Sequence, residues 1–208
     1  MARMSFAVLF FALPAFAEER TFTVSIDGHP AGELVVGFEK RSDGTTAVTI
    51  RGDYRAERPT PVSFDYRGTE SWKDGRLVRL EGLGSANGHK GGITLVAGKD
   101  AYSLKAGVKE VRVRDDVWPT LAAMLPDPEH KPLVVDIMSG DVLRAKVETG
   151  GTDRVTVDGK SLAVTHCRAT AGPNHWDSCY DESKRLAKWA WTRDGRTVAA
   201  ELKHIKGD

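Results

Sequence analysis

Apolar and polar residues alternate along most of this chain, and this period of two constrains the fold more than any other feature. The pattern is clearest at Phe22, Val24 and Ile26, which are interleaved with Thr and Ser. It recurs at 34–38, 48–50, 111–113, 155–157 and 162–164. Successive side chains of a strand point to opposite faces, so the pattern indicates strands with one buried face. The sequence therefore predicts a mainly β protein.

Asp-Gly dipeptides separate these strands at 27–28, 43–44, 74–75, 158–159 and 194–195. Asp-Gly favours a two-residue turn because both residues tolerate a positive φ, and such turns join antiparallel neighbours. The dipeptides at 74–75, 158–159 and 194–195 predict three clear hairpins. A series of hairpins favours a single curved antiparallel sheet or half-open barrel, with a closed barrel as the alternative.

One segment has the pattern of a helix. Acidic residues at 115–116 and Pro119 suit a helix N-terminus, and Pro126 would end the helix. We expect one short helix packed against the sheet, with Trp118, Leu121 and Leu125 on its buried face. The Pro-rich stretch 126–132 is the best candidate boundary. Neither side of it has a complete set of strands, so we expect a single β-rich domain over 18–208.

The first seventeen residues have the pattern of a cleaved secretory signal peptide. Arg3 precedes an apolar run over 5–16, and the small-x-small sequence at 15–17 is followed by acidic residues. The run is shorter than the roughly 20 residues of a spanning helix, and no later segment is apolar enough to cross a bilayer. We expect Glu18 to be the first mature residue of an exported protein that does not span the membrane.

The charge and the missing motifs exclude several classes of function. Lys and Arg number 30 against 29 Asp and Glu, a balance that argues against nucleic acid as a partner. The chain contains no Gly-x-Ser-x-Gly, no His-Glu-x-x-His and no nucleotide-binding glycine motif. The acidic pairs at 115–116 and 181–182 are interpreted as solvated groups beside turns. We therefore expect no cofactor and favour a protein that is not an enzyme.

The two cysteines allow two interpretations. Export would place Cys167 and Cys179 in an oxidising compartment, and the turn sequence between them predicts a structural disulfide. The alternative is a metal-handling or redox site that also uses His166 and His175, since exported copper and zinc proteins use such ligands. Neighbouring residues 166 and 167 point to opposite faces of a strand, which argues against all four binding one ion.

Several longer motifs together resemble a known family. They are Thr-Phe-Thr-Val-Ser-Ile-Asp-Gly-His-Pro-Ala-Gly at 21–32, Glu-Ser-Trp-Lys-Asp-Gly-Arg-Leu at 70–77, Asp-Ile-Met-Ser-Gly at 136–140 and Trp-Asp-Ser-Cys-Tyr-Asp at 176–181. The chain resembles a family of exported bacterial proteins whose function is unknown, and the resemblance covers nearly the whole mature chain. It implies a periplasmic location and supplies no catalytic residues. A looser likeness is to periplasmic lipoprotein carriers, whose curved sheet and capping helix hold acyl chains.

These observations favour a non-catalytic periplasmic binding or carrier module for an apolar ligand or an extended partner segment. Trp189 and Trp191 share one strand face, and with Trp118, Leu121 and Leu125 they form the candidate ligand-binding set. Aromatic residues also suit cross-strand packing in a core, which is the structural alternative. Two other functions stay open: the metal or redox protein, and an envelope scaffold or assembly factor with no small ligand.

Overall fold

The computed structural model describes residues 18–57, 61–125, 133–193 and 195–207. The predicted signal peptide and the Pro-rich stretch lie outside the described residues. The strands are β1 (Glu18–Ile26), β2 (His29–Lys40), β3 (Thr46–Ala56), β4 (Val62–Lys73), β5 (Arg76–Ala86), β6 (His89–Ala97), β7 (Tyr102–Ala106), β8 (Lys109–Val113), β9 (Val117–Pro119), β10 (Leu133–Val135), β11 (Val142–Leu143), β12 (Lys146–Val157), β13 (Lys160–Ala171), β14 (Asn174–Asp181), β15 (Leu186–Arg193) and β16 (Arg196–Lys206).

Thirteen strands form one antiparallel sheet in the order β12-β13-β14-β15-β16-β1-β2-β3-β4-β5-β6-β7-β8. The last strand, β16, pairs with the first, β1, so the two ends of the described chain meet in the middle of the sheet. In the described chain β8 and β12 are edges that do not pair with each other. The prediction of a mainly β, open antiparallel sheet is confirmed, and the closed barrel is excluded for these residues.

The tight turns follow the Asp-Gly pattern. Asp74 and Gly75 join β4 to β5 with φ of +50° and +74°, and Asp158 and Gly159 join β12 to β13 with φ of +51° and +74°. Both residues of each turn are in the left-handed region, as a two-residue hairpin requires. These two predicted hairpins are confirmed. The third also forms, with β15 paired to β16, although residue 194 lies outside the described residues.

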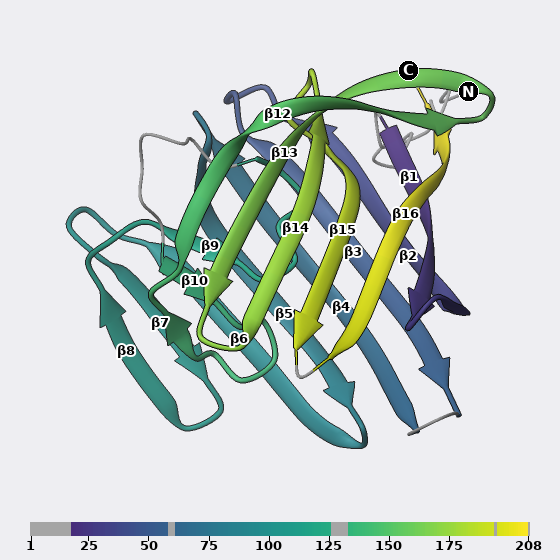
Figure 1. The fold of residues 1–208 in the computed structure, drawn as a ribbon. Helices are drawn as coiled ribbons and strands as arrows, with labels where there is room; N and C mark the ends of the chain where they lie inside the picture. The colour runs from purple at the N-terminus through teal and green to yellow at the C-terminus, as the bar shows by residue number, and fades with distance from the viewer. Residues whose placement is uncertain (1–17, 58–60, 126–132, 194, 208) are drawn as a thin grey trace, which may run out of the picture.

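The sheet curls into two limbs with a small second sheet between them. In Figure 1 the green-to-yellow strands β12–β16 form the near limb, and the blue and teal strands β2–β6 form the far limb. Strands β9, β10 and β11 make the three-stranded second sheet, here called the plug together with the connecting residues 120–125 and 136–141. The buried apolar side chains of both limbs and the plug form one core cluster.

The predicted helix at 117–125 is wrong: Val117–Pro119 is strand β9, and the described residues contain no helix. β9 pairs in parallel with β10, whose Val134 lies opposite Trp118. Further along, the amide of Leu125 donates to the carbonyl of Lys184 at 2.9 Å, and the carbonyl of Ala123 accepts from Leu186 at 2.9 Å. Since residues distant in the sequence satisfy these backbone groups, the segment avoids the nucleation cost that makes a two-turn helix marginal. No helix in the described chain is long and apolar enough to cross a membrane.

Candidate ligand-binding pocket

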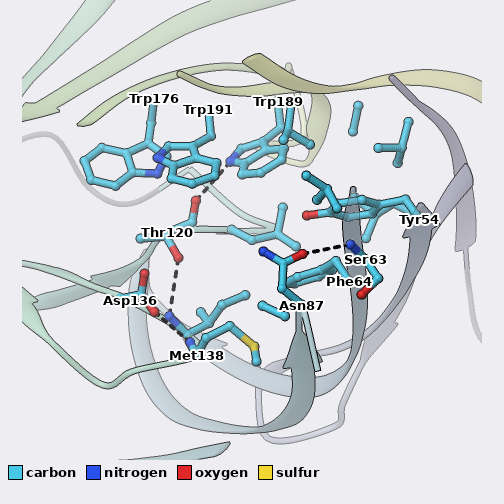
Figure 2. Close-up of a pocket in the computed structure, with 18 residues that line it drawn as sticks. Tyr54, Ser63, Phe64, Asn87, Thr120, Asp136, Met138, Trp176, Trp189 and Trp191 are labelled. Carbon is cyan, nitrogen blue, oxygen red and sulfur yellow. Dashed lines mark hydrogen bonds between the residues drawn. The ribbon is translucent and has the colours of Figure 1, made fainter. Parts of the chain in front are cut away.

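A cavity of about 250 Å³ lies between the two limbs and the plug. It faces the plug on one side and both limbs on the others (Figure 2). Its lining is mostly apolar and strongly aromatic. The lining residues are Val24, Leu34, Tyr54, Val62, Ser63, Phe64, Ala86, Asn87, Thr120, Leu121, Asp136, Ile137, Met138, Trp176, Trp189, Trp191, Val198 and Ala200.

Three tryptophans make the near wall of the pocket. Trp176 on β14 lies directly opposite Trp191 on β15. Trp189 is two residues before Trp191 on β15, so its side chain lies on the same face. Figure 2 shows the three indoles side by side. The indole N–H of Trp189 donates to the carbonyl of Thr120 at 2.9 Å, and that of Trp191 donates to Oδ1 of Asn174 at 3.2 Å. These hydrogen bonds fix the two indole rings in place, and the carbon atoms of the rings line the cavity.

The far wall comes from β3 and β4. Tyr54 and Phe64 are cross-strand partners, and their rings stack with centroids 4.7 Å apart and planes 17° apart. Stacked pairs of this kind contribute about 1 kcal/mol beyond the area that they bury. Burial also raises the pKa of the Tyr54 hydroxyl far above its usual value, so it stays neutral. This wall is therefore aromatic and uncharged.

Two polar side chains of the pocket, those of Asp136 and Asn87, bind the backbone of the pocket itself. Oδ1 of Asp136 accepts hydrogen bonds from the amides of Met138 and Ser139, both at 2.8 Å. Oδ1 of Asn87 accepts from the amide of Ser63 at 2.9 Å. Among the described lining residues Asp136 is the one charged side chain. Because these side chains already bind backbone amides and the rest of the lining is mostly apolar, the pocket suits binding of apolar surface rather than acid–base chemistry.

The structure divides the predicted ligand-binding set. Leu121, Trp189 and Trp191 line the pocket. Trp118 lies behind it, against a much smaller cavity that it shares with Ala122 and Trp176, and Leu125 packs on the core without lining the pocket. Trp118, Leu121 and Leu125 do not share one helical face, because the predicted helix does not form.

The predicted ligand-binding set left out three aromatic residues that line the pocket: Trp176, Tyr54 and Phe64. The period of two was enough to place Trp189 and Trp191 together on one face. The position of Trp176 beside them depends on the register between β14 and β15, which contains a bulge between Cys179 and Tyr180. That irregularity has no local signature in the sequence.

The predicted disulfide is wrong, because Cys167 and Cys179 are both free and buried. Strands β13 and β14 pair His166 with Cys179 and Cys167 with Ser178. The two cysteines are thus one residue out of register, and a shift of one residue moves a side chain to the other face of the sheet. Cys167 points to the inner face, which carries Tyr180 and Trp176, whereas Cys179 lies on the outer face.

We expect protein prepared without reductant to have two free thiols per chain. Burial raises the pKa of both thiols to about 11, so the reaction with a thiol reagent must be measured after unfolding. Mass spectrometry after alkylation in denaturant should show two added groups with or without prior reduction. Alkylation that needs prior reduction would contradict the observed register.

A buried ion network ties the start of β1 to the turn between β14 and β15. Arg20, only 2% exposed, donates to Asp181 and to Glu18, and its Nη1 reaches the carbonyl of Leu186 at 2.8 Å. Arg185 also binds Glu18, with Nη1 and Oε2 2.5 Å apart. The interpretation of Asp181 as a solvated acid is wrong, because its carboxylate is buried and the side chain of Arg20, from β1, reaches across to bind it.

A second buried acid lies beneath the plug. Oε2 of Glu70, on β4, accepts from the indole N–H of Trp72 at 2.6 Å and from the amide of Ala123 at 3.4 Å. Oε1 of Glu70 has no hydrogen-bond partner among the described residues. Burial raises the pKa of Glu70 to about 8, against the smaller opposing effect of these two donors. The carboxyl is therefore largely neutral at pH 7 and joins the plug to the far limb.

Together these features define an open, β-barrel-like protein whose curved sheet encloses an apolar pocket. The chain belongs to the family described as Domain of unknown function (DUF6134), which matches residues 22–203. The prediction of an uncharacterised family is confirmed.

One similar solved structure is a β-barrel-like protein of the domain of unknown function DUF1849 from Brucella abortus. The TM-score is 0.63 at 9% identity, with 95% of this chain and 100% of the other chain covered. At this identity the likeness concerns the fold alone. No curated protein matches the chain.

Proposed function

We propose that the protein is a non-catalytic periplasmic module that binds an apolar ligand, with an acyl chain or a small ring system of that ligand in the tryptophan-walled pocket. The observation that carries the proposal is the cavity of about 250 Å³ with its aromatic lining. Apolar protein cavities of about 150 Å³ bind benzene, and pockets for larger ligands begin near 300 Å³. The pocket therefore suits one chain or ring rather than a bulky molecule.

The anchoring of the aromatic side chains supports a pocket that stays open for a ligand. Protein interiors are close-packed, and voids larger than a water molecule are few. Trp189 and Trp191 are large enough to reduce this cavity, but hydrogen bonds to Thr120 and Asn174 hold them at its wall. The space is thus maintained by polar contacts at its wall, an arrangement expected of a binding site.

Export and carrier activity are part of the proposal. The signal-like segment before Glu18 supports a periplasmic location, where amphiphiles cross an aqueous space and need shielding. An extended partner segment is the alternative occupant, because β8 and β12 offer free sheet edges among the described strands. The enclosed aromatic pocket favours the small apolar ligand, since an added strand at either edge would make no use of it.

Quenching of tryptophan fluorescence by a brominated fatty acid tests the pocket directly. Because three tryptophans line the cavity, we expect saturable quenching by the brominated acid and none by the unbrominated acid, which should compete. Ala86→Phe places a ring in the cavity and should weaken binding at least ~10-fold, roughly the loss of a buried chain segment.

The matched control for this experiment is Ser85→Phe. Ser85 precedes Ala86 on β5 and points to the opposite face of the sheet, so the same ring is added outside the pocket. Binding by this variant should equal that of the wild type. Quenching that does not saturate, or that falls equally in both variants, would overturn the proposed pocket.

A further inference from the structure

We propose that a divalent transition-metal ion, with Zn²⁺ as the best match, binds on the outer face of the sheet at His166, Asp177 and Cys179. These three side chains lie on β13 and β14, on the face opposite the pocket. The site is separate from the proposed ligand binding and does not depend on it.

The register of two strands brings the three donors together. His166 is the direct cross-strand partner of Cys179, and Asp177 lies two residues before Cys179 on the same face. Nδ1 of His166 is 3.5 Å from Sγ of Cys179 and 3.5 Å from Oδ1 of Asp177. One donor atom from each residue lies within 4.8 Å of the other two.

These separations fit a tetrahedral metal ion. Zinc bonds of about 2.3 Å to sulfur and about 2.0–2.1 Å to nitrogen or oxygen place neighbouring donors roughly 3.4–3.6 Å apart. The two His166 contacts already have this length, so binding requires little movement of the backbone. Thiolate and imidazole donors select zinc or copper over calcium and magnesium, which prefer oxygen ligands.

The surrounding residues orient the donors as in known metal sites. Oδ2 of Asp153, on β12, lies 3.6 Å from Nε2 of His166. A histidine that binds a metal commonly has a carboxylate at its other ring nitrogen, which fixes the ring and strengthens it as a ligand. Nε of Arg168 donates to Oδ2 of Asp177 at 3.2 Å, so Oδ1 remains directed toward His166.

The site has one open side. Cys179 is buried, whereas the side chains of His166 and Asp177 are 27% and 44% exposed. The ion can enter past Asp177, and water completes the fourth position, as in zinc sites with three protein ligands. Binding replaces the S–H bond of Cys179 by a metal–sulfur bond, and the proton passes to solvent. Lys188 is the cross-strand neighbour of Cys179 on β15, and its Nζ forms an ion pair with Oε1 of Glu201 at 2.7 Å.

The arrangement differs from the four-residue site considered from the sequence. Cys167 is on the inner face, as its pairing with Ser178 requires. His175 lies four residues before Cys179 on the same strand, a distance of about 13 Å. Asp177 takes their place as the third donor.

Cobalt(II) added to the chelator-treated full chain tests the proposal, because thiolate-to-cobalt charge transfer absorbs in the near ultraviolet. We expect one Co²⁺ per chain with this band, and displacement of Co²⁺ by Zn²⁺. Cys179→Ser should abolish the band. The matched control Cys167→Ser, which removes the other buried thiol, should retain it.

Two exposed positions keep the test decisive if Cys179→Ser does not fold, as judged by circular dichroism. Asp177→Asn should weaken Co²⁺ binding, and Asp153→Asn should weaken it about 10–100-fold while the band persists, because Asp153 positions His166 without binding the ion. A wild-type chain with no charge-transfer band at millimolar Co²⁺ would overturn the site. A band that is lost in Cys167→Ser and kept in Cys179→Ser would also overturn it.

Discussion

Arg20→Met is expected to lower the free energy of unfolding by about 3–5 kcal/mol, one of the two largest effects that the structure predicts. The guanidinium of Arg20 is buried and binds two carboxylates, those of Glu18 and Asp181. Removal of one partner leaves the buried Asp181 without its cation, which costs far more than the pair contributes. Urea unfolding of the wild type and the variant measures the difference.

Arg79→Met is the matched control. Arg79 binds Glu81 in an ion pair whose side chains are both about half exposed. An exposed pair contributes less than about 1 kcal/mol, so this substitution should hardly change stability. The double variant Arg20→Met with Asp181→Leu should recover part of the loss, because the unpaired buried charge is removed as well. Equal stability of Arg20→Met and Arg79→Met would contradict the ion network.

The damage from Arg20→Met should extend to the plug. Arg20 donates to the carbonyl of Leu186, and the amide of Leu186 donates in turn to the carbonyl of Ala123 in the plug. The backbone of Met124 also pairs with that of Arg185 in an isolated antiparallel β-bridge. Amide hydrogen exchange at 120–125 in the plug should therefore accelerate more in this variant than exchange in the thirteen-stranded sheet.

The second large effect is a fall in stability with rising pH that depends on Glu70. The folded state raises the pKa of Glu70 to about 8, above the value near 4.5 of the unfolded chain. Between these two values the folded state binds more protons than the unfolded state. The contribution of neutral Glu70 is therefore complete below pH 4.5 and is lost as the pH rises through about 8, at about 1 kcal/mol per pH unit.

Glu70→Gln isolates this contribution. The amide oxygen of Gln can still accept from Trp72 and Ala123, but it does not ionise. We expect the variant to match the wild type near pH 5 and to exceed it in stability near pH 9, as measured by urea unfolding at both values. Parallel pH profiles for the two proteins would show that Glu70 does not titrate in this range.

Local features of the chain were sufficient to predict much of the fold. A period of two and Asp-Gly turns identify strands and hairpins because strand alternation and turn φ angles are properties of a few neighbouring residues. The hairpins at 74–75 and 158–159 follow directly. The placement of Trp189 and Trp191 on one face follows from the same rule.

The errors concern interactions between distant segments. The segment 117–125 has helix-like residues, but backbone bonds to β10 hold 117–119 as a strand, and bonds to residues 184–186 hold 123–125 in a non-helical conformation. Cys167 and Cys179 were expected to pair because a turn brings their strands together, and a register difference of one residue places them on opposite faces. Neither outcome can be derived from the composition of the segment itself.

The sequence by itself determined the strands, the tight turns and the balance of charge, since each of these depends on adjacent residues. Only the tertiary structure decided the pocket, the burial of the Arg20 guanidinium and of the Glu70 carboxyl, and the meeting of His166, Asp177 and Cys179. The physical reason is that curvature and register are collective properties of thirteen paired strands. They depend on all the contacts of the sheet, so a single strand carries no signature of them.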